Sequence, residues 1–285
     1  VDIHEDVSCA DLYEFGDRHM LLCISHRMGC RYYLGDWKNE QFHPAFHAQM
    51  SWADNGFFAP RSLLDDRGRR IMWAWILDGR DEEARNASGW SGTMCLPRVL
   101  SPASDRSLLI TVPEELEALR YNPREREHLT VLADSETIIE DVRGDTLEMC
   151  IEFAPSTTER VGVKVCRSDH GEEETLIYYD SVAKKLTVDT RRSGGDEEAH
   201  GPGIADSVAQ KVESGPFELA AGEPLELRIF VDRSVVEVFA NKRQAVMRRI
   251  YPTREDSLGV SLWSIGGDAT ATSLRAWDVA ASNPY

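Results

Sequence analysis

Residues 69–78 read RRIMWAWILD, and within them lies the richest apolar run of the sequence, seven residues from Ile71 to Leu77. A run of this length, with arginine before it and aspartate after it, is typical of a buried β-strand. It is much shorter than the ~20 apolar residues that a membrane-spanning helix needs. The sequence on both sides of this strand repeats the same pattern of short apolar segments separated by turn residues.

These segments are rich in β-branched and aromatic residues and are bounded by Gly, Asp, Asn, Ser or Pro. We interpret them as strands at residues 19–26, 30–37, 69–78, 107–112, 146–153, 160–168, 174–180, 185–190, 225–232, 234–241, 244–252, 258–264 and 274–280. Helical periodicity is scarce, and only VPEELEALR at 112–120, with Pro113 in a first-turn position, predicts a short helix. The pattern indicates an all-β protein, built as a propeller, a barrel or a sandwich.

The texture of the sequence changes between Ser101 and Arg126, where aromatic-rich strands give way to three prolines and the short helix. We therefore expect an incomplete β domain over 1–102, a linker with a short helix over 103–126, and a β-sandwich over 127–285. Within the last part, TRRSGGDEEAHGPG at 190–203 predicts a surface loop.

The composition excludes some classes of partner. The chain has 285 residues, with 32 Lys and Arg against 49 Asp and Glu, a net charge of −17. Nucleic acid and anionic membranes both require a basic face, so neither is expected as a partner, whereas a neutral sugar is indifferent to this charge. Oligomeric state and compartment stay open.

No cofactor or metal is expected. The sequence has no phosphate-binding glycine loop, nucleophile elbow or zinc-ligand spacing. His43 and His47 are four residues apart, but they lack a nearby third ligand and are interpreted as surface residues. The cysteines are expected to be free thiols, mostly buried: Cys9, Cys23, Cys30, Cys95, Cys150 and Cys166.

Two longer stretches carry a family resemblance. The first is DNGFFAPRSLLDDRGRRIMWAWI at 54–76, followed by GWSGTMCLPRVL at 89–100, and the second is FVDRSVVEVFANKRQAVMRRIYP at 230–252. In this order and spacing they resemble glycoside hydrolase family 32, the invertases, inulinases, levanases and related β-fructosidases. The resemblance implies a five-bladed β-propeller, of which this chain would hold about the last three blades, followed by a C-terminal β-sandwich.

The resemblance also implies retaining cleavage of fructosyl linkages in sucrose or fructans. Relatives carry a Glu-Cys-Pro-Asp-Leu-Phe segment whose glutamate is the general acid/base, and here SCADLY, residues 8–13, matches it. The nucleophile segment, Trp-Met-Asn-Asp-Pro-Asn in relatives, and their Arg-Asp-Pro segment do not occur in this sequence. We therefore expect the C-terminal portion of a glycosidase, with the nucleophile on an upstream segment, and expect this portion alone to be inactive.

Ser8 occupies the position of the family's acid/base glutamate, and a serine hydroxyl cannot donate a proton to a glycosidic oxygen at neutral pH. Glu5 is the candidate for a displaced acid/base, with Asp6 as its competitor. Glu5 and Ser8 would face opposite sides of a regular strand, so the replacement of Ser8 by Glu5 requires a β-bulge or a shifted turn. Cys9 and Asp11 match the family's residues beside the acid and are candidates for the substrate site.

Asp54 matches the aspartate of the family's Asp-Tyr-Gly segment, so the resemblance implies contact with substrate hydroxyls, although Asp-Asn-Gly is also a favourable turn. Trp52 is a candidate for stacking on a sugar ring, with a core position as the alternative. Other matching residues are assigned to packing: Trp73, Trp75, Trp90, Pro97 and Arg98. Glu237 is expected to face solvent between Val236 and Val238.

Two other functions stay open. A chain that has lost its acid could be a non-catalytic carbohydrate-binding relative, and Ser8 favours this alternative. A different propeller glycosidase, of the arabinosidase kind, is the third hypothesis.

Overall fold

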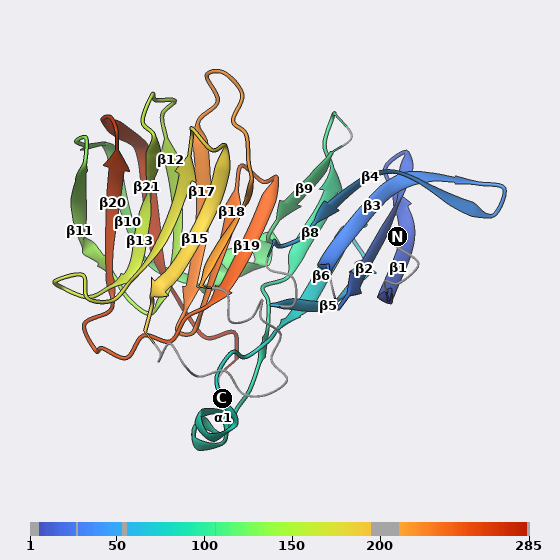
Figure 1. Cartoon of the computed structure of the whole chain (residues 1–285), viewed down its shortest axis with the longest axis horizontal. Coiled ribbons are helices and arrows are strands. Elements are labelled where there is room, and N and C mark those ends of the chain that lie inside the picture. The colour runs from blue at the N-terminus through green and yellow to red at the C-terminus, as the bar shows by residue number, and fades with distance from the viewer. Residues whose placement is uncertain (1–5, 27, 53–55, 106, 195–210, 284–285) are drawn as a thin grey trace. The chain divides into compact units, whose positions relative to one another are not determined.

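Strands dominate the protein, as the sequence predicts (Figure 1). The computed structural model describes residues 6–26, 28–52, 56–105, 107–194 and 211–283. No helix among these residues is long and apolar enough to cross a membrane. The chain forms two compact units, the first mainly from residues up to Pro113 and the second mainly from Glu114 onward.

The first unit contains two antiparallel sheets, each a meander of four strands in sequence order. The first sheet has the order β1-β2-β3-β4, and the second has the order β5-β6-β8-β9 with β7 paired to β6. The strands are β1 (Ser8–Phe15), β2 (Arg18–Ser25), β3 (Gly29–Lys38), β4 (Gln41–Gln49), β5 (Phe57–Leu64), β6 (Arg70–Ile76), β7 (Thr93–Met94), β8 (Arg98–Pro102) and β9 (Leu108–Thr111). One helix, α1 (Glu82–Ser88), begins at the N-cap Asp81 and ends at Gly89, whose φ of 76° is in the left-handed region.

Four-stranded antiparallel meanders are the building unit of β-propellers. The described residues of this unit form two such sheets, fewer than the three blades that the resemblance implied. Each has a strand with a fully buried apolar side: Met20, Leu22 and Ile24 on β2, and Met72, Ala74 and Ile76 on β6, all with 0% exposure. These residues occupy every second position of their strands, which places them on one face of each sheet, where they form a core.

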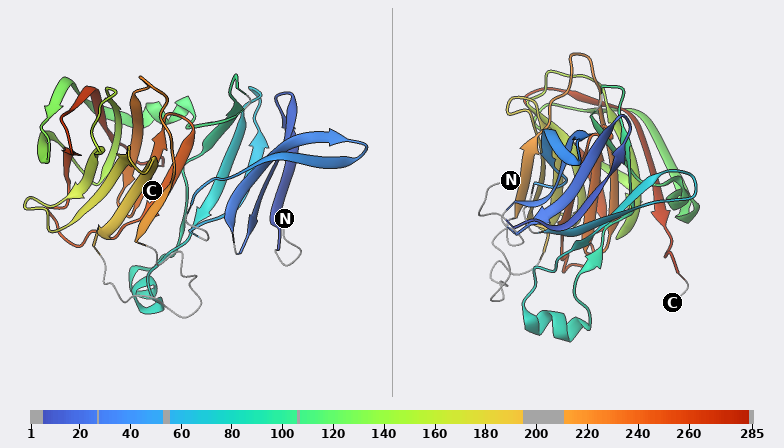
Figure 2. Two further views of the ribbon diagram at one scale, coloured as in Figure 1. Left: turned by 45° about the horizontal axis from the view of Figure 1, so that its top comes forward. Right: turned by 90° about the vertical axis from the view of Figure 1, so that its right-hand side faces the viewer.

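The second unit is built from two six-stranded antiparallel sheets, which Figures 1 and 2 show as two layers. One sheet has the order β10-β21-β12-β17-β18-β19, and the other has the order β11-β20-β13-β14-β15-β16. The elements are η1, a 3-10 helix (Glu114–Leu119), and the strands β10 (Arg120–Val131), β11 (Ser135–Arg143), β12 (Thr146–Phe153), β13 (Arg160–Arg167), β14 (Glu174–Asp180), β15 (Lys185–Arg192), β16 (Val212–Pro216), β17 (Leu225–Asp232), β18 (Val235–Ala240), β19 (Gln244–Arg249), β20 (Gly259–Ile265) and β21 (Ala269–Val279).

Alternation along β12 shows where the core of this unit lies. Leu147, Met149, Ile151 and Phe153 are each at most 2% exposed, and they occupy every second position of the strand. Such a period places them on one face of the sheet, where the apolar side chains of the two layers meet. The sequence therefore builds a β-sandwich core in the way that its strand pattern indicated.

The opposite face of β12 carries a buried carboxylate. Glu148 is 0% exposed. Its Oε1 accepts hydrogen bonds from Arg120 Nη2 at 2.6 Å and Arg228 Nε at 2.7 Å, and its Oε2 accepts one from Arg120 Nε at 2.8 Å. The guanidinium of Arg120 also lies 4.1 Å from the ring centroid of Trp277. The carboxylate of Glu148 on β12 thus links β10 and β17 through its hydrogen bonds to Arg120 and Arg228.

Several expectations need correction or qualification. Glu237 was expected to face solvent, but it is 3% exposed, because both faces of β18 are covered. Trp75 and Trp90, assigned to packing, are 45% and 43% exposed, whereas Arg98 is fully buried against Phe57 as a packing residue would be. Residues 103–126 contain β9, η1 and the first half of β10, and the loop expected at 190–203 lies largely outside the described residues.

Candidate functional site

A β-bulge marks the start of β1, the strand that matches the family's acid/base segment. Ser8 pairs with Ile24 and Asp11 pairs with Leu22, so β1 has one more residue than β2 between these two pairs. Cys9 has a φ of 52°, a left-handed conformation that is unusual for a residue with a side chain. The bulge shifts the register of the hairpin by one residue and thereby brings Asp6 opposite His26.

Asp6, Ser8 and His26 form a hydrogen-bonded group at this end of the hairpin. Asp6 Oδ1 accepts from the His26 backbone N–H at 3.1 Å, and Asp6 Oδ2 lies 2.7 Å from His26 Nδ1. Ser8 Oγ donates to the same carboxylate at 3.4 Å. The hydrogen bonds from His26 lower the pKa of Asp6 below its ordinary value, so the carboxylate is ionised and stays an acceptor.

Asp11 is held by the neighbouring sheet. Its Oδ2 accepts hydrogen bonds from the Ser62 backbone N–H at 3.1 Å and from Ser62 Oγ at 2.5 Å. Arg61 Nη1 adds a hydrogen bond to the carbonyl oxygen of Ala10, inside the bulge, at 3.1 Å. The adjacent residues of β5 thus fix both the bulge and the carboxylate that follows it.

The other sequence-predicted site residues are placed as follows. Glu5, the candidate acid/base, and Asp54, the candidate for binding sugar hydroxyls, lie outside the described residues. Cys9 is a free, half-buried thiol in the bulge, and Trp52 is half-buried in the bend after β4. The bulge lies between Ser8 and Asp11, so it is not the bulge before Ser8 that the displaced-acid hypothesis requires.

Sequence reasoning missed His26 and Ser62, the residues that hold Asp6 and Asp11. The hairpin turn at Gly16 and Asp17 could have indicated His26, because counting back along the two strands places the end of β2 against the start of β1. No comparable signal identifies Ser62, which lies 51 residues from Asp11 on a strand of the other sheet.

Among the described residues, no group of three or more His, Cys, Asp or Glu side chains could hold a metal ion. His43 and His47, expected at the surface, are both exposed on β4, and His47 stacks on Tyr33 with ring centroids 4.5 Å apart.

Solved structures share this fold. Fructan 1-exohydrolase IIa from Cichorium intybus matches with a TM-score of 0.83 and 18% identity, covering 96% of this chain and 62% of that one. A variant of that enzyme in complex with 1-kestose matches with a TM-score of 0.84 and 17% identity, again over 96% of this chain and 62% of that chain. The arrangement of meander sheets followed by a β-sandwich is therefore a fold that this chain shares with solved structures.

Sequence comparison identifies the family. The "Glycosyl hydrolases family 32 N-terminal domain" matches residues 5–113, and the "Glycosyl hydrolases family 32 C terminal" domain matches residues 115–278. The chain belongs to glycoside hydrolase family 32, and the resemblance seen in the sequence motifs is confirmed.

Individual relatives are more distant. The sucrose-6-phosphate hydrolase of Zymomonas mobilis is 26% identical over 292 residues, covering 96% of this chain and 54% of the relative. The levanase of Bacillus subtilis is 28% identical over 262 residues, covering 88% of this chain and 37% of the relative. The chain thus spans about half or less of the length of these two proteins.

Proposed function

We propose that this chain is the C-terminal portion of a β-fructosidase-type glycoside hydrolase that cleaves fructosyl linkages in sucrose or fructans with retention of configuration. The observation that carries the proposal is the ordered match to both family domains, over residues 5–113 and 115–278. Relatives named as sucrose-6-phosphate hydrolase, levanase and raffinose invertase support this reaction class.

In the proposed mechanism, an aspartate on a segment preceding this chain attacks the anomeric carbon of the fructosyl unit. Glu5, brought to the substrate by a shifted turn before β1, protonates the departing glycosidic oxygen and then takes a proton from the water that hydrolyses the covalent intermediate. Retaining hydrolysis requires the two carboxyl groups to be about 5–5.5 Å apart. A general acid must also hold its proton near neutral pH, so its pKa has to be raised.

The group around Asp6 supports Glu5 over its competitor. His26 lowers the pKa of Asp6 and holds both carboxylate oxygens, which suits an acceptor that fixes the hairpin and not a proton donor. We assign to Asp11 a positioning role, because Ser62 holds its carboxylate. Cys9, Trp52 and Asp54 remain the candidates for substrate contact.

The test uses the protein with the coding sequence that precedes Val1 in its gene, and residues 1–285 alone. Released fructose is measured with sucrose, inulin and levan. The longer protein is expected to hydrolyse at least one of them, Glu5→Gln to lower kcat by ~10²–10⁴-fold, and the matched variant Asp6→Asn to change it much less. Fructose release by residues 1–285 alone would contradict the upstream nucleophile, and full activity of Glu5→Gln would contradict the role of Glu5.

A second candidate function is a carbohydrate-binding relative without catalysis. Ser8 favours it, because the hydroxyl at the family's acid position donates to Asp6 and offers no acid of its own. Affinity electrophoresis in inulin or levan gels separates the two functions. Retardation of the longer protein without fructose release supports binding alone, whereas turnover that is lost in Glu5→Gln supports the hydrolase.

A further inference from the structure

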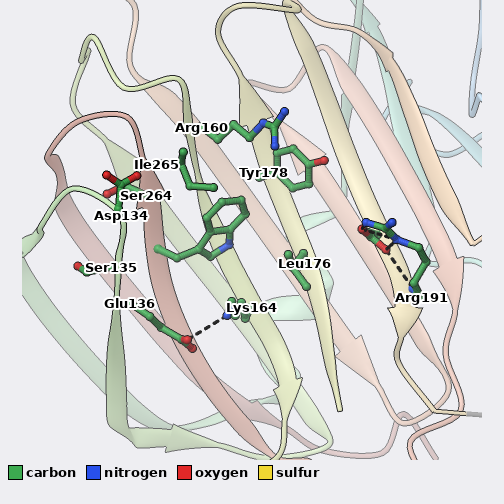
Figure 3. A pocket seen from close by; sticks show the side chains of 12 residues that line it. Asp134, Ser135, Glu136, Arg160, Lys164, Leu176, Tyr178, Arg191, Ser264 and Ile265 are labelled. Carbon is green, nitrogen blue, oxygen red and sulfur yellow. Dashed lines mark hydrogen bonds and ion pairs between the residues drawn. The ribbon is translucent and has the colours of Figure 1, made fainter. Parts of the chain in front are cut away.

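The β-sandwich carries a hollow of about 530 Å³ on the outer face of the sheet that contains β11, β20, β13, β14 and β15 (Figure 3). It lies wholly within the second unit, and none of the residues assigned to the proposed hydrolase mechanism lines it. Aromatic, aliphatic and charged side chains line it together, so a ligand that fits the hollow should have both apolar and polar faces.

A glycine creates the floor of the hollow. Gly162 on β13 pairs with Trp263 on β20 at one side and with Tyr178 on β14 at the other. A Cβ atom at Gly162 would lie 2.6 Å from the Cβ of Tyr178 and 2.1 Å from the carbonyl oxygen of Ile177. Because no side chain separates them, the two rings meet edge to face with centroids 5.3 Å apart. Leu176 on the same face as Tyr178 extends this apolar floor.

Fixed polar groups border the floor. Lys164 Nζ lies 2.9 Å from Glu136 Oε2, as Figure 3 shows. Burial by itself would raise the pKa of Glu136, but hydrogen bonds from Ser261 and Lys164 and the charges of Lys164 and Arg167 outweigh it and lower the pKa. Glu136 is therefore an ionised acceptor whose orientation is fixed before any ligand arrives.

The charges that line the hollow balance. Three acids, Asp134, Glu136 and Asp189, face three bases, Arg160, Lys164 and Arg191. Each base is already ion-paired: Arg191 with Asp189 at 2.5 Å, Arg160 with Asp180 at 2.8 Å, and Lys164 with Glu136. A phosphorylated or otherwise anionic ligand would meet bases whose charge a carboxylate already offsets. The hollow therefore favours a neutral ligand that forms hydrogen bonds.

The indole of Trp263 adds a polar group without a partner. The side chain is 7% exposed, and its Nε1–H has no hydrogen-bond acceptor among the described residues. A buried donor that is left unpaired lowers stability, and such groups in native proteins call for an explanation. A ligand oxygen entering the hollow, with small shifts of the side chains around it, would supply the acceptor.

We propose that this hollow binds a short neutral oligosaccharide. The C–H faces of a sugar ring suit the floor of Tyr178, Trp263 and Leu176, and its hydroxyl groups suit the orientated carboxylates and guanidinium groups of the rim. The choice of a fructosyl oligosaccharide rests on the proposed function, because a fructosidase acting on a fructan would meet such chains.

The experiment titrates residues 1–285 with 1-kestose, nystose and, for comparison, maltotriose, up to about 20 mM, by isothermal calorimetry or tryptophan fluorescence. A dissociation constant on the order of 1 mM is expected for the two fructosyl sugars, as for a shallow site with few contacts. Tyr178→Leu, which removes the aromatic floor, and Leu176→Arg, which fills the hollow, should each raise it at least tenfold. The matched control is Tyr121→Leu, on the other sheet of the sandwich, and it should leave the dissociation constant unchanged.

Far-UV circular dichroism and thermal melting confirm that each variant is folded before titration. Absence of binding by the folded wild-type chain overturns the proposal, as does binding that both hollow variants retain. Equal affinity for maltotriose overturns the fructosyl assignment. Since no hydrolysis is measured, failure here leaves the hydrolase proposal untouched. Failure of the hydrolase test removes only the ground for choosing fructosyl sugars, and binding of an oligosaccharide in the hollow is still decided by the titration.

Discussion

Replacing Glu148 by glutamine tests how much one buried charge contributes to the sandwich. The Glu148 side chain is 1% exposed, and its partners Arg120 and Arg228 are 16% and 24% exposed, so water screens the cluster only partly. Glutamine keeps the size of the side chain, but it removes the negative charge that two guanidinium groups share. Its amide nitrogen is a donor that must also face other donors.

The magnitude follows from these contacts. Removing one partner of a buried ion pair costs about 3–5 kcal/mol, and the three hydrogen bonds to Glu148 place this cluster within that range. At roughly 2–4 °C per kcal/mol for a unit of this size, the melting temperature should fall by about 6–20 °C.

The assay is urea unfolding of the chain followed by far-UV circular dichroism, with the m-value checked for constancy. Glu226→Gln, at an exposed position on β17, is the matched control and should change the free energy of unfolding by no more than about 0.5 kcal/mol. Adding Arg120→Met to Glu148→Gln should cost less than Arg120→Met costs alone, because the attraction is already gone. A loss for Glu148→Gln as small as that of the control would refute the reasoning.

Three further predictions concern other parts of the chain. Ser62→Ala removes the hydroxyl that binds Asp11 at 2.5 Å and should destabilise the first unit by about 1.5–3 kcal/mol in urea unfolding, whereas Ser107→Ala, at an exposed hydrogen bond, should have little effect. Burial would raise the pKa of Glu173, but hydrogen bonds from Ser257, Thr253 and Arg254 lower it below 4.5. The stability that the Glu173 carboxylate contributes is therefore complete above pH 4.5 and is lost on further acidification. In melting temperatures measured as a function of pH, Glu173→Gln should flatten the fall on the acid side. Burial raises the pKa of the Cys166 thiol to about 12, so dithionitrobenzoate at pH 8 should not label Cys166 in the folded chain but should label the half-buried Cys9. Cys9→Ser should remove the fastest phase of the labelling reaction.

Each of these predictions has a contrary outcome. Equal losses for Ser62→Ala and Ser107→Ala would show that Asp11 does not need its partner on β5. An unchanged acid limb in Glu173→Gln would assign the acid sensitivity to other carboxylates. Labelling of Cys166 as fast as Cys9 in the folded chain would show that the strands around Cys166 open readily.

Strands with a strong apolar pattern could be predicted from the sequence, and those without one could not. The segment 146–153 was predicted as a strand and is β12, because alternate burial leaves a plain signal there. The first part of β10, up to residue 126, was instead predicted as a linker, since YNPREREH is charged and contains Pro123. The structure explains the difference: among the described residues β10 pairs with β21 alone, and its register shifts between Tyr121 and Arg124, where a proline is tolerated.

The candidate site was predictable only where the family motifs mark it. The match of SCADLY marked the segment that starts β1, but it predicted neither the strand nor the bulge after Ser8. The partners of Asp6 and Asp11 come from the turn after β2 and from β5, which only the folded chain brings together. Glu237 was misplaced for a related reason, because alternation predicts an exposed side chain only when one face of the strand meets water.

The position of β10 at the border of its sheet has a consequence for the protein in concentrated solution. A border strand offers free backbone groups on which another chain can template a new strand, the first step toward fibres. β10 carries Pro123, a kinked register and the run of alternating charges REREH at 124–128. Each of these features disfavours the addition of a strand, so the segment least like a strand in the sequence protects the sandwich against assembling with its own copies.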